Sequence, residues 1–335
     1  MQPSSISATV NFELDGVQHG FLTLPHSHDG SAWGSVMIPI TVIKNGEGPT
    51  SLLTGGNHGD EYEGITALLK LSHELNAEAI SGRVIIVPMM NHPAVQAGTR
   101  TSPIDGGNLN RSFPGDPTGL LTEKIADYFT RYLVPMCDFA LDLHSGGKTL
   151  DIVPFAAAHR LEDPLLATSC LRGAKLFGAP YTMLMHELDA SALYDTVVEE
   201  QGKVFVTTEL RGGGTTTPQT MAYAERGIRN FLRFAGNLAG EYQYPAEPTR
   251  LLDMQDSQCY LQSEHVGIAE YHVELGAKVE VGEVIVSLYS PLRSGEASID
   301  YRAKQIGILA ARRFPSMVNM GDTIAVIAKD CGPLA

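Results

Sequence analysis

The sequence predicts an α/β fold followed by a small all-β module. Between residues 50 and 240, short apolar runs typical of buried strands alternate with stretches whose apolar residues have helical spacing. From about Tyr244 the pattern changes: the linker-like segment PAEPTRLLD comes first, and short strands alone follow it. We therefore expect two domains, an α/β domain over residues 1–243 and a β-sandwich over residues 244–335.

Composition and charge limit the class of protein. The chain has 335 residues, of which 43% are hydrophobic, so it has room for a large core. We expect no membrane partner, because no run approaches the ~18 apolar residues of a membrane helix, and the first residues lack the features of a secretion signal. A net charge of −14 disfavours nucleic acid and anionic membranes as partners. The four cysteines are far apart and form no C-x-x-C, which favours reduced thiols in a cytoplasmic protein.

The first fifty residues are predicted to form short strands. The segments SATVNFEL, HGFLTLP and SVMIPITVI are rich in β-forming residues and are separated by turn residues. His26, His28 and Asp29 lie in the second of these turns. No other ligand is indicated nearby, so we interpret this group as a solvated turn and not as a metal site.

The segment TSLLTGGNHGDEYEG, residues 50–64, organises the rest of the chain. It predicts a buried strand, a tight glycine-rich turn and a helix that begins at the turn. His58 and Glu61 lie in that turn, and in open α/β sheets ligands bind at the carboxyl ends of strands. The pair is suited to gripping one divalent ion. The same spacing at His159 and Glu162 is interpreted only as the start of a helix.

A second strand, residues 84–90, leads into a long irregular segment, residues 91–118. Irregular segments of this length inside a compact domain are usually functional or disordered. This one contains Arg100 and then the run GNLNRSFPG, in which Arg111 follows Asn110. A guanidinium beside an amide suits bidentate capture of a carboxylate. The alternative is a pair of solvated surface arginines.

A helix over residues 122–133 is predicted to lead into the strand DFALDLH, residues 138–144. Side chains alternate along a strand, so Asp142 and His144 point to the same side. An ionisable group inside an apolar strand is costly unless it is paired or bound. We therefore predict His144 as the third metal ligand and Asp142 as the carboxylate that orients an imidazole. The alternative is a buried histidine satisfied by Asp142 alone.

The sheet is expected to continue through strands at residues 152–155, 181–185 and 203–208. Helices are expected at residues 165–176, 192–200 and 218–234. Glu209 follows the last of these strands and precedes a run of glycines. It thus has the same kind of position as His58 and His144, although a lone glutamate there could also simply face solvent.

These residues together predict a catalytic metal centre. Two histidines and one glutamate leave a coordination position open for water, which is typical of catalytic and not of structural zinc. Zinc activates that water and polarises a carbonyl. Glu209 has the right chemistry for the general base, Arg100 for balancing an oxyanion, and Arg111 for anchoring a carboxylate.

The C-terminal part contains an internal repeat. The sequence Gly267-Ile268, followed by VEVGEVI, recurs as Gly307-Ile308, followed by VNMGDTI. Two similar halves predict a small sandwich like that of biotinyl-carrier modules. The Met-Lys-Met turn that carries the prosthetic group is missing, so we expect a wall or lid over the α/β site instead.

The motifs GGNHGDE, NLNRSFPG, LDLHSGG and TTELRGGG resemble the zinc-dependent succinylglutamate desuccinylase/aspartoacylase family. The resemblance implies a zinc-carboxypeptidase-like α/β/α core with a mixed sheet, one Zn²⁺ per chain and a small-molecule N-acyl amino acid as substrate. Asp60 stands where relatives often have asparagine. The implied roles are zinc ligation by His58, Glu61 and His144, water activation by Glu209, oxyanion binding by Arg100, and α-carboxylate binding by Asn110 and Arg111.

Within the family, the N-terminal segment is most similar to the N-acetyl-diaminobutyrate deacetylases of ectoine breakdown. Such a substrate has a side-chain ammonium, and Glu187 and Asp189 are the candidates for binding it. Three alternatives stay open: an enzyme for N-acyl acidic amino acids, a peptide metallocarboxypeptidase and a non-catalytic binding protein. The sequence leaves the acyl group and assembly into a homo-oligomer open.

Overall fold

The computed structural model describes residues 3–185 and 191–334. Its strands are β1 (Ser7–Ala8), β2 (Gly16–Pro25), β3 (Ser35–Asn45), β4 (Thr50–Gly55), β5 (Gly82–Val87), β6 (Phe139–His144), β7 (Leu150–Ile152), β8 (Phe155–His159), β9 (Tyr181–Met185), β10 (Val204–Glu209), β11 (Arg250–Met254), β12 (Tyr260–Gln262), β13 (Gly267–Tyr271), β14 (Lys278–Val279), β15 (Val284–Tyr289), β16 (Ile299–Arg302), β17 (Gly307–Arg313), β18 (Met317–Val318) and β19 (Thr323–Pro333).

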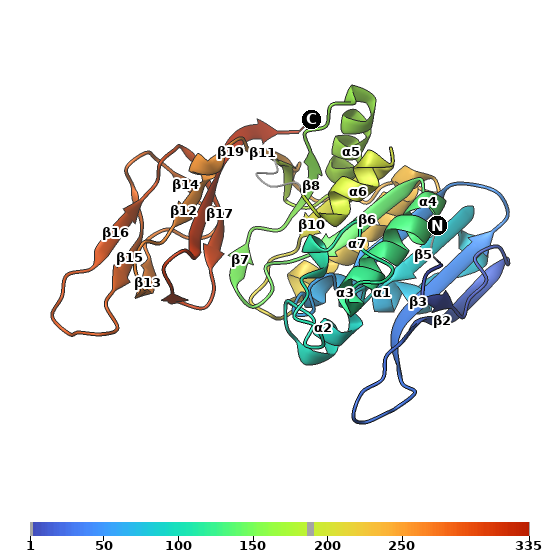
Figure 1. The fold of residues 1–335 in the computed structure, drawn as a ribbon. Helices are drawn as coiled ribbons and strands as arrows, with labels where there is room; N and C mark the ends of the chain where they lie inside the picture. The colour runs from blue at the N-terminus through green and yellow to red at the C-terminus, as the bar shows by residue number, and fades with distance from the viewer. Residues whose placement is uncertain (1–2, 186–190, 335) are drawn as a thin grey trace.

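Most of these strands form one mixed sheet. Its order is β1-β2-β3-β5-β4-β6-β10-β8-β9-β11-β19-β17-β14, with β12 paired to β19 and β7 to β17 (Figure 1). A second sheet, β16-β15-β13-β18, is antiparallel. The predicted α/β fold with a mixed sheet and an all-β C-terminal part is therefore confirmed.

Helices cover both faces of the α/β part of the sheet. The helical segments are α1 (Tyr62–Glu74), η1 (Ala77–Ala79), α2 (His92–Ala97), η2 (Leu109–Arg111), α3 (Leu121–Tyr128), the π-helical η3 (Phe129–Leu133), α4 (Val134–Met136), α5 (Pro164–Phe177), α6 (Tyr194–Glu200), α7 (Pro218–Ala235) and η4 (Ser257–Cys259). α1, α5 and α7 pack together on one face, whereas α3 to α4 and α6 lie on the other. None of the described helices is long and apolar enough to cross a bilayer.

The central strands β4 and β5 each contain consecutive apolar residues because both of their faces are buried. Leu52 and Ile85 belong to the core under α3 and α6, while Leu53 and Ile86 belong to the core under α1 and α7. Successive side chains of a strand point to opposite faces, so each neighbouring pair supplies both cores. This explains why β4 and β5 show continuous apolar runs and no alternation.

The two long helices on the α1 face have the expected end signals. Asp163 caps α5 by accepting a hydrogen bond from the backbone N–H of Leu165 at 2.9 Å, and Pro164 takes the first helical position. Thr217 and Pro218 play the same roles in α7. Each helix ends at a glycine in the left-handed conformation.

Four predicted segments differ from the structure. Residues 152–155 are not one strand, because β7 ends at Ile152 and β8 begins at Phe155, with Pro154 between them. His159 does not begin a helix but ends β8, and α5 starts five residues later. The irregular segment 91–118 contains α2 and η2, and the helix predicted over residues 122–133 continues through a π-helical turn to Met136.

The N-terminal segment forms a long hairpin of β2 and β3, as predicted. The two strands pair over their full common length, whereas the first predicted strand is reduced to β1. His28 and Ser31 exchange backbone hydrogen bonds of 3.0 and 2.9 Å at the exposed hairpin end. The interpretation of His26, His28 and Asp29 as a turn is thus confirmed.

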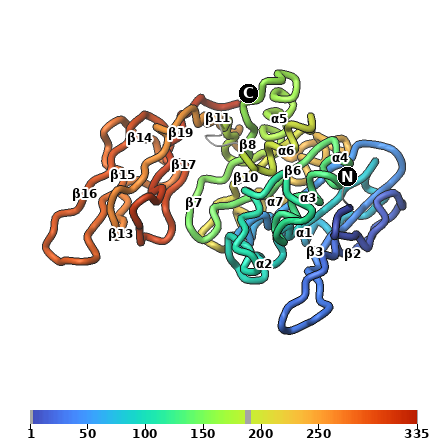
Figure 2. Tube along the Cα trace, viewed as in Figure 1, coloured from blue at the N-terminus to red at the C-terminus, as the bar shows by residue number. Residues whose placement is uncertain are grey.

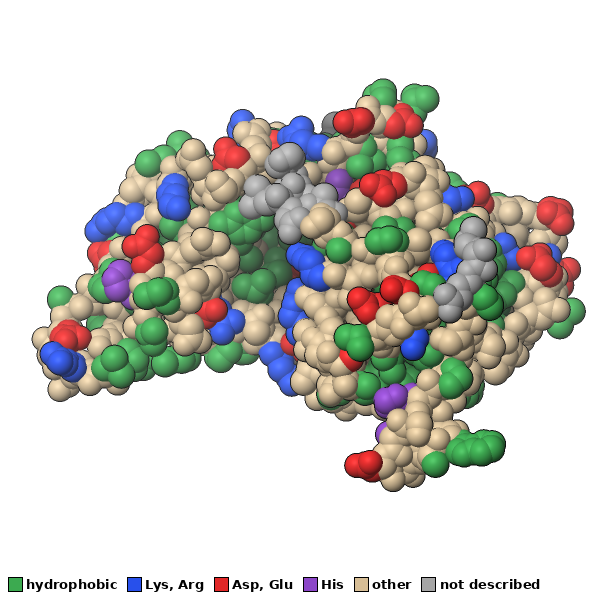
Figure 3. All heavy atoms as spheres, viewed as in Figure 1, with side chains coloured by type: hydrophobic (Ala, Val, Ile, Leu, Met, Phe, Trp, Pro, Cys, Tyr) green, Lys and Arg blue, Asp and Glu red, His purple; other side chains and the backbone are tan. Residues whose placement is uncertain are grey.

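The C-terminal repeat is visible as a reciprocal exchange of short strands. Gly267 of β13 pairs with Val318 of β18, and Gly307 of β17 pairs with Val279 of β14. Each half therefore lends a short strand to the other half, and the two layers enclose a shared core. In the ribbon and tube views this module lies to one side of the α/β part, and the surface is hollowed between them (Figures 1, 2 and 3).

Backbone pairing joins the module to the main sheet. β11 pairs in parallel with β9 on one side and antiparallel with β19 on the other. β7, from the α/β part, pairs with β17 of the module. All four cysteines are free, and three of them are buried.

Candidate metal centre and active site

The candidate site lies at the carboxyl ends of three neighbouring parallel strands. β4 pairs in parallel with β6, and β6 pairs in parallel with β10. His144 ends β6 and Glu209 ends β10, and the two residues are direct partners in the strand register. His58 and Glu61 follow β4 in the turn that leads into α1. The crevice predicted from the strand-end motifs is therefore formed.

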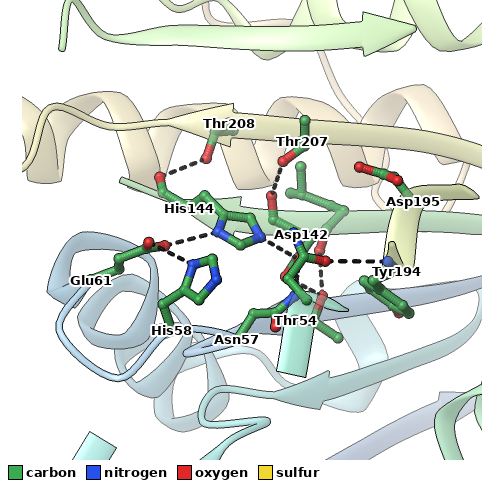
Figure 4. A network of polar contacts seen from close by, with 12 residues as sticks. Thr54, Asn57, His58, Glu61, Asp142, His144, Tyr194, Asp195, Thr207 and Thr208 are labelled. Carbon is green, nitrogen blue, oxygen red and sulfur yellow. Dashed lines mark hydrogen bonds and ion pairs between the residues drawn. The ribbon is translucent and has the colours of Figure 1, made fainter. Parts of the chain in front are cut away.

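His58, Glu61 and His144 form a buried group with the geometry of a metal site. One ligand atom from each lies within 4.8 Å of the others, and no residue of the three is more than 8% exposed. Glu61 bridges the histidines, with its Oε1 2.7 Å from Nδ1 of His58 and its Oε2 2.8 Å from Nδ1 of His144 (Figure 4). Two imidazoles and a carboxylate that converge in this way fit a divalent cation with an open position.

Polar side chains orient both imidazoles through the ring nitrogen that faces away from Glu61. Nε2 of His144 lies 2.8 Å from Oδ2 of Asp142, whose other oxygen accepts a hydrogen bond of 2.7 Å from the Thr54 hydroxyl. Nε2 of His58 lies 3.1 Å from Oδ1 of Asn108. Since an oxygen acceptor holds the proton on Nε2, the Nδ1 lone pair of each ring is available to a cation.

Asp142 has the contact that the sequence predicts, whereas the contact of Asn108 was not predicted. Asn108 stands in the NLNR run, 50 residues from His58, and only the folding of that loop brings the two together.

Two glycines allow the close approach that places Glu61 beside His144. A Cβ atom at Gly64 would lie 2.4 Å from Cβ of Leu143, so this glycine lets the first turn of α1 pack against the end of β6. A Cβ atom at Gly59 would lie 2.0 Å from the backbone of Ala94, at α2. The glycines of the GGNHGDEYEG run therefore serve backbone packing as well as turning.

The electrostatics favour an ionised Glu61 between the two rings. Burial would raise the pKa of Glu61, but His58 and His144 outweigh it and lower that pKa. Burial likewise opposes the charge on His144, yet Asp142 and Glu61 raise its pKa well above the usual value. The pKa of His58 is lowered, chiefly by burial. Glu61 and Asp142 thus favour a proton on His144, and a divalent cation would displace that proton from Nδ1 on binding.

Glu209 is a carboxylate without a hydrogen-bond partner for one oxygen. It lines the same cavity as the three ligands, and among the described residues its buried Oε2 has no partner. Burial and the nearby Glu61 raise the pKa of Glu209 to about 8. A divalent cation beside it would lower that pKa again, because a positive charge stabilises the carboxylate.

The residues predicted to contact substrate line the cavity as well. Arg100, Asn110 and Arg111 are all part of its wall. Nη1 of Arg100 lies 3.4 Å from Oε1 of Glu61, and this side chain is 47% exposed. Nη1 of Arg111 donates to the backbone oxygen of Asn110 at 2.7 Å. The arginines therefore reach the cavity from its solvent side.

Asp60 and Lys148 hold the loop that carries Arg100. Oδ2 of Asp60 accepts a hydrogen bond of 2.8 Å from the backbone N–H of Lys148, and Nζ of Lys148 donates to the backbone oxygen of Gly98. Asp60, next to the ligand Glu61, therefore helps to fix the position of Lys148 and, through it, of the backbone at Gly98.

The structure adds His159, Asp195 and Tyr260 to the cavity wall. His159 is buried, with Nδ1 2.9 Å from Oε1 of Glu199. The sequence contains a pattern that indicates His159 as a site residue, because it is an ionisable residue at the end of an apolar strand, like His144. Tyr260 comes from β12, so the C-terminal module contributes to the site. The two predicted ammonium ligands, Glu187 and Asp189, lie outside the described residues.

A shared carboxylate ties the loop after Glu209 to the module. Asp151 of β7 accepts hydrogen bonds from Arg211, at 3.1 Å, and from Arg312 of β17, at 3.0 Å. Arg211 has a φ of 89°, a left-handed conformation that is unfavourable for a residue with a side chain. The charge pair with Asp151 helps to hold that conformation.

Comparison with known proteins identifies the class that this fold and site define. The protein-family model for the succinylglutamate desuccinylase/aspartoacylase catalytic domain matches residues 47–235. This range includes every ligand and catalytic candidate described above. The chain belongs to the succinylglutamate desuccinylase/aspartoacylase family. It is an enzyme, a hydrolase of amide bonds.

Individual relatives match nearly the whole chain. The N-alpha-acetyl-L-2,4-diaminobutyric acid deacetylase of Halomonas elongata is 67% identical over 98% of this chain and 96% of its own length. The product-bound ectoine utilization protein EutE (DoeB) from Ruegeria pomeroyi is 53% identical, with a TM-score of 0.96, over 98% of this chain and 100% of that one. A succinylglutamate desuccinylase from Silicibacter sp. TM1040 is 55% identical, with a TM-score of 0.95 and the same coverage.

Proposed function

We propose that this enzyme is a zinc-dependent deacetylase that hydrolyses N-alpha-acetyl-L-2,4-diaminobutyrate to acetate and diaminobutyrate. The observation that carries the proposal is the 67% identity, over nearly the full length of both chains, to a deacetylase of that substrate. Two histidines, a bridging glutamate and a second carboxylate, one oxygen of which has no hydrogen-bond partner among the described residues, converge in the candidate site and support the same class of reaction.

The donor set fits one zinc ion per chain. His58, Glu61 and His144 would hold the ion, and three protein ligands with an open position are typical of catalytic zinc. When bound, zinc makes a water ligand a strong nucleophile at neutral pH and polarises a carbonyl group. Asp142 and Asn108 keep the two imidazoles in the tautomer and orientation that ligation requires.

The remaining polar residues have distinct roles in hydrolysis. The Glu209 carboxylate takes a proton from the attacking water and returns it to the departing α-amine, so that water adds across the amide bond. The Arg100 guanidinium stabilises negative charge on the acyl oxygen. Asn110 and Arg111 bind the α-carboxylate, which fixes the amide bond relative to Glu209. We expect this chemistry in the cytoplasm.

Hydrolysis of N-acyl acidic amino acids is the second candidate. It is favoured by the 55% identity to a chain described as a succinylglutamate desuccinylase. The test is a comparison of purified enzyme on N-acetyl-diaminobutyrate, N-acetyl-aspartate and N-succinyl-glutamate, with zinc present and after chelation. A clear preference for either dianionic substrate would replace the proposal with this candidate.

Arg111→Lys tests the carboxylate anchor. Lysine keeps the positive charge but loses the two-pronged geometry, so we expect kcat/KM to fall by the equivalent of roughly 1.5–3 kcal/mol, typical of hydrogen bonds to charged groups. A substrate whose α-carboxylate is amidated should be poor for the wild type and lose little more in the variant. Steady-state kinetics on both substrates measure the difference.

Arg293→Lys is the matched control, because the Arg293 side chain is 79% exposed. It should leave both substrates unaffected. Equal proportional losses for the acid and the amide in Arg111→Lys would contradict an anchoring role for Arg111.

A further inference from the structure

The cavity beyond the metal ligands has one carboxylate that the proposed reaction does not use. The cavity has a volume of about 350 Å³, near the lower end of the range for small-molecule sites. Among the described residues its wall contains four carboxylates, from Glu61, Asp142, Asp195 and Glu209. Metal ligation, imidazole orientation and proton transfer account for the other three, which leaves Asp195.

Asp195 is held in a defined position. It lies in the first turn of α6, where its Oδ1 accepts a hydrogen bond of 2.5 Å from the backbone N–H of Thr196. Its other oxygen lies 3.8 Å from Nε2 of His159, within ion-pair distance. The Asp195 side chain is only 13% exposed. A carboxylate buried to this degree is stabilised by a cation that enters the cavity.

Asp195 is also close to the proposed carboxylate anchor. The backbone N–H of Tyr194, its chain neighbour, donates to Oδ1 of Asn110 at 3.2 Å. The first turn of α6, which carries Asp195, therefore lies against the segment that carries Asn110 and Arg111, and all three residues line the same cavity. In diaminobutyrate the two charged groups are separated by a short carbon chain, which matches neighbouring subsites of opposite charge.

Thr207 supplies a second polar group to this part of the wall. Its hydroxyl donates to the backbone oxygen of Asp142 at 3.2 Å, so the oxygen lone pairs remain suited to accept from an ammonium. Figure 4 shows Thr207 and Asp195 at the end of the polar cluster away from Glu61. Both residues line the cavity.

The described part of the cavity wall suits a dianionic substrate less well. Its arginines are Arg100 and Arg111, and both have roles with groups that every N-acyl amino acid carries. The histidine in this part of the wall, His159, stands between the carboxylates of Glu199 and Asp195. Two carboxylates at that place repel an anion.

We infer that Asp195, with the Thr207 hydroxyl, forms the subsite that binds the side-chain ammonium of the substrate and thereby selects cationic N-acetyl amino acids. This inference rests on the proposed deacetylase function and names the residue that determines its specificity. Asp195 contacts the part of the substrate remote from the scissile bond, so its loss affects substrate choice and leaves metal binding intact.

The test compares Asp195→Asn with the wild type on two substrates. Asparagine keeps the oxygen that accepts from Thr196 but loses the charge. N-acetyl-2,4-diaminobutyrate carries the ammonium, and N-acetyl-2-aminobutyrate has the same carbon chain without it. We expect kcat/KM of the variant to fall roughly 10- to 100-fold on the charged substrate, mainly through KM, and by less than about 3-fold on the neutral one.

Glu200→Gln is the matched control, since Glu200 is exposed on the same helix. It should leave both substrates unaffected, and zinc content and melting temperature should be unchanged in both variants. If Asp195→Asn loses the same factor on both substrates, or if the wild type does not prefer the ammonium, the subsite is refuted while deacetylation stands. If the zinc-loaded wild type cleaves neither substrate, the proposed function itself fails.

Discussion

Replacement of Glu209 by glutamine is expected to lower kcat by ~10²–10⁴-fold, the usual cost of losing a general base. Glutamine keeps the size and the hydrogen-bonding reach of the side chain but accepts no proton at neutral pH. Glu209 lies beside the ligand group without belonging to it, so the variant should keep its zinc. Steady-state turnover of N-acetyl-diaminobutyrate measures kcat, and elemental analysis measures the zinc content of the variant.

The pairing of these two measurements makes the prediction specific. If zinc and activity disappear together, Glu209 is a ligand and not a base. If both are retained, the proton is accepted elsewhere. KM should change little, because Glu209 acts on the water and not on the groups that anchor the substrate.

Replacement of His144 by alanine is expected to remove most of the bound zinc and nearly all activity. The substitution deletes one of the three ligands and leaves Glu61 and Asp142 without their shared imidazole. Two buried carboxylates would then face each other without the ring between them, which further disfavours the folded site. Metal content, turnover and melting temperature should all fall in this variant.

His73→Ala provides the comparison, since His73 is an exposed histidine of α1. It should retain zinc and full activity. Chelation of the wild type should abolish activity, and added zinc should restore it in the wild type and in His73→Ala but not in His144→Ala. Full zinc occupancy in His144→Ala would mean that the metal site lies elsewhere.

The three metal ligands can be predicted from the sequence because each of them follows or ends a recognisable short sequence pattern. His58 and Glu61 follow a strand and two glycines, and His144 ends an apolar strand. Parallel strands bring such ends to one edge of a sheet, so local patterns were sufficient to group the residues. The α/β core and the repeated C-terminal half were predictable for the same reason, since both show in short stretches of sequence.

The rest of the cavity depends on contacts that local patterns do not contain. β8 runs antiparallel to β10, and this pairing places His159 away from the ligand edge and beside α6. Asn108 directly precedes the short 3-10 helix η2, and Asp195 lies in the first turn of α6, where no local pattern indicates which polar side chains face the cavity. Only the packing of those segments against the strand ends turns them toward the site.

The pairing of β11 with β9 has a consequence for how this chain can be divided. A chain cut after residue 243 would lose β11 and leave the backbone of β9 unpaired along one side. β9 reads Tyr-Thr-Met-Leu-Met, without charge or proline, and an exposed edge of that kind is a template for association between chains. The α/β part on its own should therefore aggregate at concentrations where the whole chain does not.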